Sequence, residues 1–190
     1  MGILIDSDLK FKSHIKHINS KCFSLIGSVF RVFRSLSPEI YLCFYCTYVL
    51  PVIDYGSPIY IHGYTSAIKD IEKVQRSFTR RLFRRLFPSQ TIPSYESRLK
   101  SFKLTTLADR FVSTDLITVY KIINSFMIGP SFARYSPRVH YRLIIPSINT
   151  SLFRNSFFHN SLMSWNRMIK KSPPQSLRSF KNLVSPSVAQ

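Results

Sequence analysis

The residues best suited to chemistry in this sequence are basic side chains between positions 73 and 85. They are Lys73, Arg76, Arg80, Arg81, Arg84 and Arg85. Residues three or four positions apart lie on one face of an α-helix, so a basic row from Lys73 to Arg84 is expected, flanked by Arg81 and Arg85. Arginine donates paired hydrogen bonds to phosphate oxygens, and such contacts hold a nucleic acid without reading its sequence. The competing interpretation is a solvated helix face.

The charge balance favours a polyanionic partner. The chain has 27 Lys and Arg against 9 Asp and Glu, which gives a net charge of +18. A compact chain with this much like charge repels itself unless an anion neutralises it. Nucleic acid and anionic membrane are the candidate polyanions. The alternative explanation of the charge excess is that an acidic partner segment has been removed.

The acids and histidines form no catalytic or metal-binding pattern. Two-metal nucleotidyl transfer requires carboxylates that converge on the ions, and the close-set pair Asp6 and Asp8 is better explained as a turn and helix cap. His14 and His17 lack further ligands at metal spacing. Glycine-rich phosphate loops and nucleophile elbows do not occur. We therefore expect no catalysis, no metal site and no cofactor.

The three cysteines predict a reducing environment. Cys43 and Cys46 resemble half of a zinc site, but they lie in an apolar run and no second pair follows, so core packing is expected. With Cys22 they make an odd set, unlike a secreted disulfide scaffold. We expect an intracellular location, cytoplasmic or nuclear.

An apolar stretch precedes the basic row. Between Glu39 and Lys69 the only charged residue is Asp54. The uninterrupted part, 40–53, is shorter than the roughly 20 residues that a membrane-spanning helix needs. A central core helix is predicted, and a small basic membrane-associated protein anchored through Ile40–Ile61 is the alternative.

Helical patterns predict a mainly α fold: a helical bundle with a short N-terminal strand and a helical C-terminal extension. Apolar residues recur at three- and four-residue steps, and proline and glycine mark the breaks. Helices are expected over residues 9–36, 39–50, 66–87, 95–107, 108–126, 152–171 and 177–184. Residues 2–5 are expected to form the strand. Residues 131–150, rich in Pro, Ser, Arg and Tyr, are expected to form a loop or a partly extended segment.

Five groups of short motifs occur in order along the chain. They are Gly2-Ile-Leu-Ile-Asp6 with Leu9-Lys-Phe11 and His14-Ile15; Leu50-Pro-Val-Ile-Asp-Tyr-Gly-Ser-Pro58; Glu72-Lys-Val-Gln-Arg76 with Phe78-Thr-Arg80; Tyr95-Glu-Ser-Arg-Leu99 with Leu104 and Leu107; and Arg154-Asn-Ser-Phe157 with Trp165-Asn166 and Ser179-Phe-Lys181. Together they resemble the region after the palm in reverse transcriptases of non-LTR (LINE-type) retrotransposons. The sequence departs from that pattern at Asp54, Leu50 and Arg167-Met168, where the family usually has Glu, Arg and Leu-Pro.

The resemblance implies an order of parts. These are a palm-exit strand remnant (1–10), a thumb-like helical region (11–92), post-thumb helices (93–130), a basic linker (131–150) and a C-terminal tail (151–190). In that family the thumb grips the template–primer duplex, and the palm carries the catalytic Tyr-x-Asp-Asp box, which this sequence lacks. The implied partners are therefore a nucleic-acid duplex backbone and the palm and fingers of the RNA-directed DNA polymerase. A degenerate reading frame without selected function is the remaining alternative.

Overall fold

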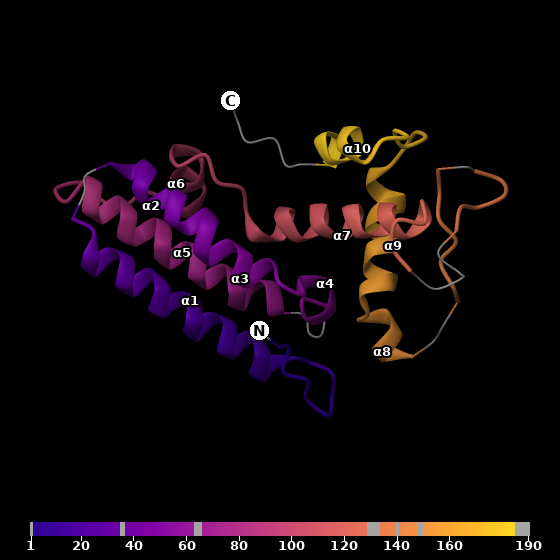
Figure 1. Ribbon diagram of the computed structural model, residues 1–190, viewed down its shortest axis with the longest axis horizontal. Coiled ribbons are helices and arrows are strands. Elements are labelled where there is room, and N and C mark those ends of the chain that lie inside the picture. The colour runs from indigo at the N-terminus through magenta and orange to yellow at the C-terminus, as the bar shows by residue number, and fades with distance from the viewer. Residues whose placement is uncertain are drawn as a thin grey trace. The chain divides into compact units, whose positions relative to one another are not determined.

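The computed structural model describes residues 2–34, 37–62, 66–128, 134–139, 141–147 and 150–184, and it confirms the mainly α class. The helices are α1 (Lys12–Val32), α2 (Pro38–Phe44), the π-helix η1 (Tyr45–Val49), α3 (Leu50–Asp54), α4 (Ser57–Tyr60), α5 (Ala67–Leu86), α6 (Tyr95–Ser101), α7 (Leu107–Ile123), α8 (Ser151–Arg154), α9 (Phe157–Met168) and α10 (Leu177–Val184), as Figure 1 shows. The chain divides into a first compact unit that runs to Ala108 and a second from Asp109 to Pro186.

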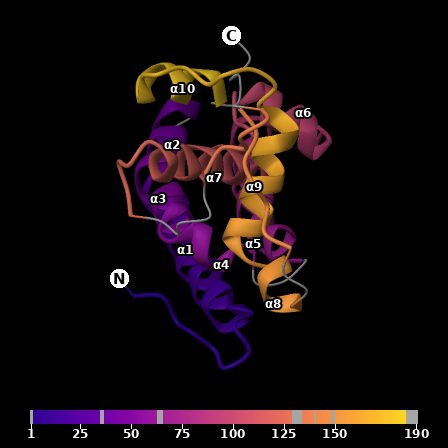
Figure 2. The same cartoon turned by 90° about the vertical axis from the view of Figure 1, so that its right-hand side faces the viewer.

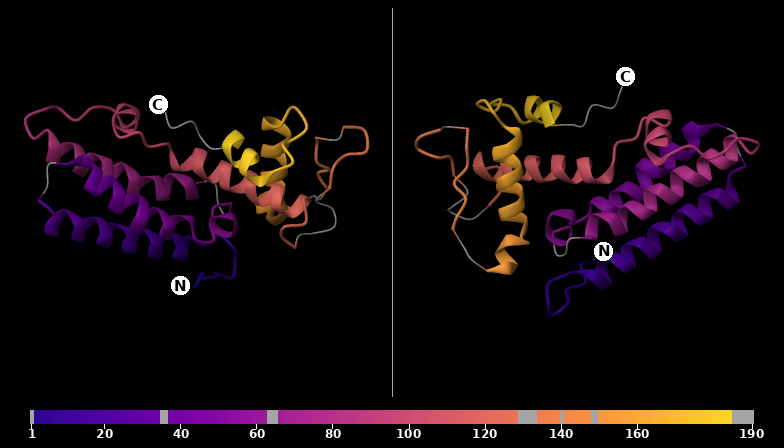
Figure 3. Two further views of the ribbon diagram at one scale, coloured as in Figure 1. Left: turned by 45° about the horizontal axis from the view of Figure 1, so that its top comes forward. Right: turned by 180° about the vertical axis from the view of Figure 1, so that it is seen from behind.

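The first unit is a helical bundle in which α1 and α5 run parallel, side by side (Figure 3). The side-chain amide of Asn19 donates to the Asp70 carbonyl at 3.1 Å near the start of both helices, and Arg85 Nη2 donates to the Phe30 carbonyl at 2.8 Å near their ends. The segment α2–η1–α3 returns antiparallel and contacts α1 and α5. The helices bury apolar stripes at three- and four-residue steps: Ile15, Ile18, Cys22, Ile26 and Val29 on α1, and Ile71, Val74, Phe78 and Leu82 on α5.

The helix expected over 39–50 continues past Pro51, because a π turn precedes the proline. The Leu50 N–H donates to the Tyr45 carbonyl, five residues back, and the helix continues to Asp54. Proline has no N–H, and in a regular α-helix its ring meets the carbonyl four residues earlier. The wider π turn relieves that conflict.

The predicted core helix 39–50 buries only one of its faces. Tyr41, Tyr45 and Val49 are fully buried, whereas Cys43 and Cys46 are exposed. The prediction that these two cysteines pack in the core was therefore wrong: the contacts of α2–η1–α3 with α1 and α5 engage the face that carries the three buried residues. Cys22 does lie in the core, and burial raises the pKa of its thiol to about 12.

The predicted N-terminal strand is absent: residues 2–6 form no regular structure. A strand requires a neighbour to accept its hydrogen bonds, and the only β contact in the described residues is an isolated bridge between Tyr135 and Leu143. The Asp6 carboxylate instead accepts from the N–H groups of Phe11 at 2.8 Å and Lys12 at 3.1 Å. Asp6 therefore satisfies two N–H groups at the start of α1, although the N-cap residue itself is Phe11.

Two further predicted helices are interrupted. The helix expected over 95–107 ends at Ser101, where Lys103 adopts a left-handed φ of 51° and the Leu104 N–H bonds back to the Leu99 carbonyl. The helix expected over 152–171 is split at Ser156, whose hydroxyl caps α9 by accepting from the His159 N–H. Helix 177–184 was predicted with its observed bounds.

The second unit is built around Trp165, which is fully buried. Its ring stacks on Phe180 with the ring centroids 5.4 Å apart, and Phe180 stacks on Tyr120 at 4.2 Å. These contacts join α7, α9 and α10, and α9 crosses α7 steeply (Figure 2). Trp165 is thus a core residue.

The described part of segment 131–150, predicted as a linker, packs on this core. Leu143 is buried in it, and Trp165 Nε1 donates to the Tyr141 carbonyl at 2.9 Å. The side-chain amide of Asn166 pairs with both backbone groups of Leu143, at 2.8 and 3.0 Å. The predicted stop at Gly129-Pro130 lies outside the described residues.

His14 should make the first unit less stable in acid. Its ring is buried, lies edge-on to Tyr60 at 5.0 Å, and accepts the Leu4 N–H at 3.3 Å. Burial lowers the pKa of His14, and nearby His17 lowers it further. A lowered folded pKa gives stability that is present above the unfolded pKa of about 6.5 and is lost as pH falls through the folded value.

Urea unfolding at about pH 7.5 and about pH 5 measures this effect. His14→Gln should reduce the loss of unfolding free energy between the two pH values. His17→Gln removes only the smaller cause of the lowered His14 pKa and leaves the buried ring in place, so it should reduce the loss much less. A pH dependence that His14→Gln leaves unchanged would contradict the assignment.

Candidate nucleic-acid interface

All six basic residues singled out in the sequence lie on α5. Lys73, Arg76, Arg80, Arg81 and Arg84 are exposed, and Arg85 is half-buried. The side opposite the basic row is the buried apolar stripe that packs on α1 and α2–η1–α3. At about 1.5 Å per residue, the basic row (Lys73, Arg76, Arg80 and Arg84) extends about 16 Å along the helix axis.

Members of the basic row differ in how they are held. Lys73 Nζ forms an ion pair with Asp70 at 2.6 Å, which partly neutralises it. The Arg76 guanidinium lies over the Tyr95 ring, 4.0 Å from its centroid, a cation–π contact that fixes the charge in place. In the described part of the chain, the side chains of Arg80 and Arg84 form no hydrogen bond or ion pair, so their donors are available to a ligand.

Arg85 and Arg81 lie toward α1 and support the bundle. Arg85 donates to the carbonyls of Phe30 at 2.8 Å and Phe33 at 3.4 Å, at the C-terminal end of α1, where the helix dipole favours a cation. Arg81 lies close enough to Gly27 that an added Cβ there would be 4.0 Å from its Nη1. Arg85 therefore has a structural role, although the sequence pattern predicted it as a nucleic-acid-binding residue.

A buried polar network lies beside the basic row and was not predicted. The Glu72 carboxylate accepts from the Tyr95 hydroxyl and, at 3.2 Å, from the N–H of Leu107, the first residue of α7. Gln75 donates to the Tyr95 hydroxyl at 3.2 Å and to the Thr105 carbonyl at 2.7 Å. The network joins α5, α6 and the start of α7. It explains why residues 93–108 belong to the first unit.

The sequence does contain a signal for this network. Glu72, Gln75 and Thr79 recur at three- and four-residue steps, one position after the apolar stripe of Ile71, Val74 and Phe78. A polar row that borders an apolar stripe on one helix lies at the edge of the core, where buried polar groups must find partners.

Removing the Tyr95 hydroxyl should destabilise the first unit. Burial and the hydrogen bond to Glu72 raise the pKa of Tyr95, so the hydroxyl stays protonated as a donor. Tyr95→Phe would leave the buried Glu72 carboxylate without this donor, at a cost of about 2 to 3 kcal/mol. Urea unfolding measures the loss. Tyr48→Phe, the same change at an exposed ring, is the control, and a double-mutant cycle with Glu72→Gln should be non-additive.

Arg98 is a further buried cation that sequence reasoning missed as a candidate site residue. Only 4% of it is exposed; its Nε donates to the Thr79 hydroxyl at 3.3 Å and its Nη1 to the Pro93 carbonyl at 2.6 Å. Burial lowers the pKa of Arg98, and the positive charges of Arg80 and Arg76 add to this effect. No carboxylate of the described residues forms an ion pair with it.

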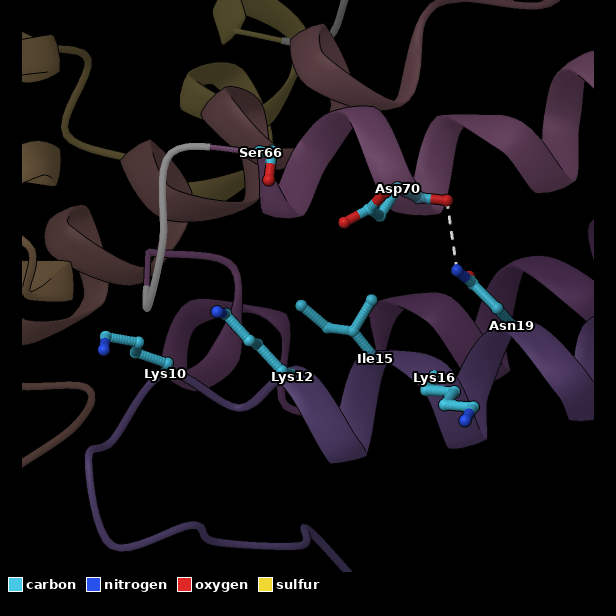
Figure 4. A pocket seen from close by; sticks show the side chains of 7 residues that line it. All are labelled: Lys10, Lys12, Ile15, Lys16, Asn19, Ser66 and Asp70. Atoms are coloured by element: carbon cyan, nitrogen blue, oxygen red, sulfur yellow. Dashed lines mark hydrogen bonds between the residues drawn. The ribbon is translucent and has the colours of Figure 1, made fainter.

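A second group of cations surrounds a pocket of about 670 Å³ between the starts of α1 and α5, the lysine pocket (Figure 4). Its lining residues are Lys10, Lys12, Ile15, Lys16, Asn19, Ser66 and Asp70. Lys12 and Ile15 point toward α5, whereas Lys16 points away along α1 (Figure 4). Lys10 is paired with Asp8 at 2.9 Å. The pocket thus gathers three lysines, one of them paired with Asp8, at the N-terminal end of α5.

Among the described residues, no three histidines, cysteines or carboxylates are grouped closely enough to hold a metal ion. Over the same residues, none of the helices combines the length and the apolar character required to cross a membrane.

The fold and the site together define a mainly helical protein with a row of exposed basic side chains on one helix face. No protein-family model matches the chain, and no solved structure matches it. The chain is similar to the Caenorhabditis elegans protein named Uncharacterized protein B0403.1. The two are 25% identical over 158 residues, which cover 83% of this chain and 73% of the relative.

Proposed function

We propose that this chain is a nucleic-acid-holding module equivalent to the thumb and post-thumb region of a non-LTR retrotransposon reverse transcriptase. The observation that carries the proposal is the exposed basic row on α5, in which Arg80 and Arg84 have free donors. Such a row contacts phosphates of a duplex irrespective of sequence. The module has no catalytic role by itself, and its second partner is the palm and fingers portion of the polymerase.

The contacts among the family-like motifs support this proposal. Glu72 and Gln75, from one motif, bond to Tyr95 of the next, and Arg76 stacks on the same ring. Thr79 accepts from Arg98. Residues that carry the resemblance therefore contact one another, as expected if they form one structural unit of that family.

The test is binding of the purified chain to a labelled RNA–DNA hybrid at several salt concentrations. Four phosphate contacts predict a slope of about −3 to −4 in a plot of log association constant against log salt concentration. The control is a scrambled basic peptide of equal charge. Binding no tighter than that of the peptide would refute the proposal, and metal-dependent primer extension by the purified chain would refute the absence of catalysis.

One observation favours a second candidate function, a peripheral membrane protein. Within the stretch proposed as an anchor, four large apolar residues are exposed: Ile40, Tyr48, Tyr55 and Ile59. Exposed aromatic and aliphatic side chains on a chain with a net charge of +18 are suited to an anionic lipid interface. Co-sedimentation with phosphatidylserine vesicles tests it: the loss of binding in Tyr48→Ser/Ile59→Ser, with hybrid binding absent in the parent chain, would favour this function.

A further inference from the structure

A pocket at the junction of α5 and α6 is lined by three arginines and has a volume of about 310 Å³. We name it the arginine pocket. Its lining residues are Arg76, Arg80, Ile92, Pro93, Ser94, Tyr95 and Arg98. Arg76 and Arg80 come from the exposed basic row, whereas Arg98 comes from the interior. None of the residues that line it is acidic.

The Arg98 guanidinium is already positioned. Hydrogen bonds to the Thr79 hydroxyl and the Pro93 carbonyl occupy Nε and Nη1. The remaining nitrogen, Nη2, makes no hydrogen bond with the described part of the chain, and it is not among the buried atoms without a partner. Because Arg98 is nonetheless 96% buried, the opening available to Nη2 is the arginine pocket that it lines.

The second cation is also fixed. Arg76 is held over Tyr95 at 4.0 Å from the ring centroid, so its guanidinium loses little freedom when it binds a ligand. Arg80 is exposed and completes the set from the next turn of α5. Glu96, on α6, lines a neighbouring groove together with Glu72 rather than the arginine pocket. Its pKa is lowered by hydrogen bonds from its own backbone N–H and from Ser94, with smaller effects of Arg76 and Arg98.

Three positive charges that repel one another around a cavity without an acid favour an anion that bridges them. Guanidinium groups match the tetrahedral oxygens of phosphate, which accepts several hydrogen bonds at once. We propose that Arg76, Arg80 and Arg98 hold a single phosphate group in the arginine pocket. The inference rests on the proposed function in taking a phosphate of the bound nucleic acid as the natural ligand; free phosphate has the same chemistry.

Thermal unfolding in inorganic phosphate, compared with sodium chloride of equal ionic strength, tests the pocket directly. A ligand that binds only the folded chain raises its melting temperature with concentration. Arg80→Gln should weaken the apparent affinity for phosphate about ten-fold, the equivalent of one charge-assisted contact. Arg84→Gln, the same change one turn further along α5, should leave that affinity unchanged. Arg98→Lys keeps the positive charge but loses the planar pair of guanidinium donors, so it should also weaken the affinity for phosphate.

Phosphate stabilisation no greater than that of chloride, or equal losses in Arg80→Gln and Arg84→Gln, would overturn the pocket. Hybrids with and without a 5′-phosphate separate the sources. If the phosphorylated hybrid binds more tightly, the pocket holds the phosphate of a strand end. If the two hybrids bind equally, and Arg80→Gln weakens their binding more than Arg84→Gln does, the pocket holds an internal phosphate. If the hybrid fails to bind while inorganic phosphate still stabilises the chain through Arg80, the pocket stands and the proposed function fails.

Discussion

Replacing Trp165 with alanine should lower the free energy of unfolding of the second unit by about 3 to 5 kcal/mol. The indole is fully buried and stacks on Phe180, and its Nε1 donates to the Tyr141 carbonyl at 2.9 Å. Truncation would remove the contacts that join α9 to α10, open a cavity, and leave that carbonyl without its partner. Such a loss is a large fraction of the stability of a domain of this size.

Amide hydrogen exchange measures this effect unit by unit. Protection should fall in α7, α9 and α10 of the variant, while α1 and α5 stay protected. Met163→Ala is the control because Met163 lies on α9 and is 45% exposed. Equal exchange in the Trp165 variant and the parent chain would show that the indole does not organise the second unit.

Replacing Arg76, Arg80 and Arg84 together with alanine should weaken hybrid binding on the order of 100-fold near physiological salt, at about 1 kcal/mol for each exposed charge contact. The salt slope should shrink by about 2 to 3, and the loss should be similar for hybrids of unrelated sequence. Each of these side chains is exposed, so folding should be retained, which circular dichroism checks.

The matched control removes three exposed arginines from the second unit: Arg142, Arg167 and Arg178. It changes the net charge by the same amount. If both triple variants lose affinity equally, the net charge of +18 drives binding and α5 has no special part in it. If only the α5 variant loses affinity and salt slope, the basic row is the interface.

The sequence predicted α5 well because its apolar and basic residues follow one helical period on opposite faces, and no proline interrupts it. It did not predict that Arg85 would bond to α1 carbonyls, since that depends on which helix packs beside it. Arg98 was overlooked because burial of a charged residue is decided by tertiary contacts with Thr79 and Pro93. Local pattern therefore located the basic row, but not the buried member of the arginine pocket.

The apolar stretch shows the opposite kind of failure. Its composition predicted burial on all sides, yet Cys43, Cys46 and Tyr48 are exposed. Hydrophobic composition indicates how much apolar surface a segment could bury. The number of neighbouring helices decides how much of that surface is buried. The predicted strand at residues 2–5 failed for a related reason, because pairing depends on a partner elsewhere in the chain.

The π turn at Tyr45–Val49 keeps side chains before and after it on the same face of the helix. Tyr41, Tyr45, Val49 and Ile53 are all fully buried although they are spaced by four residues each time. In a regular α-helix each step of four would rotate the side chain by about 40° beyond a full turn, or about 120° over the three steps. The wider turn absorbs much of this drift. Deleting one residue from the π turn would leave a regular α-helix in which eleven steps separate Tyr41 from Ile53, about 20° beyond three full turns. The buried face would therefore stay aligned, and the wider turn that accommodates Pro51 would be lost.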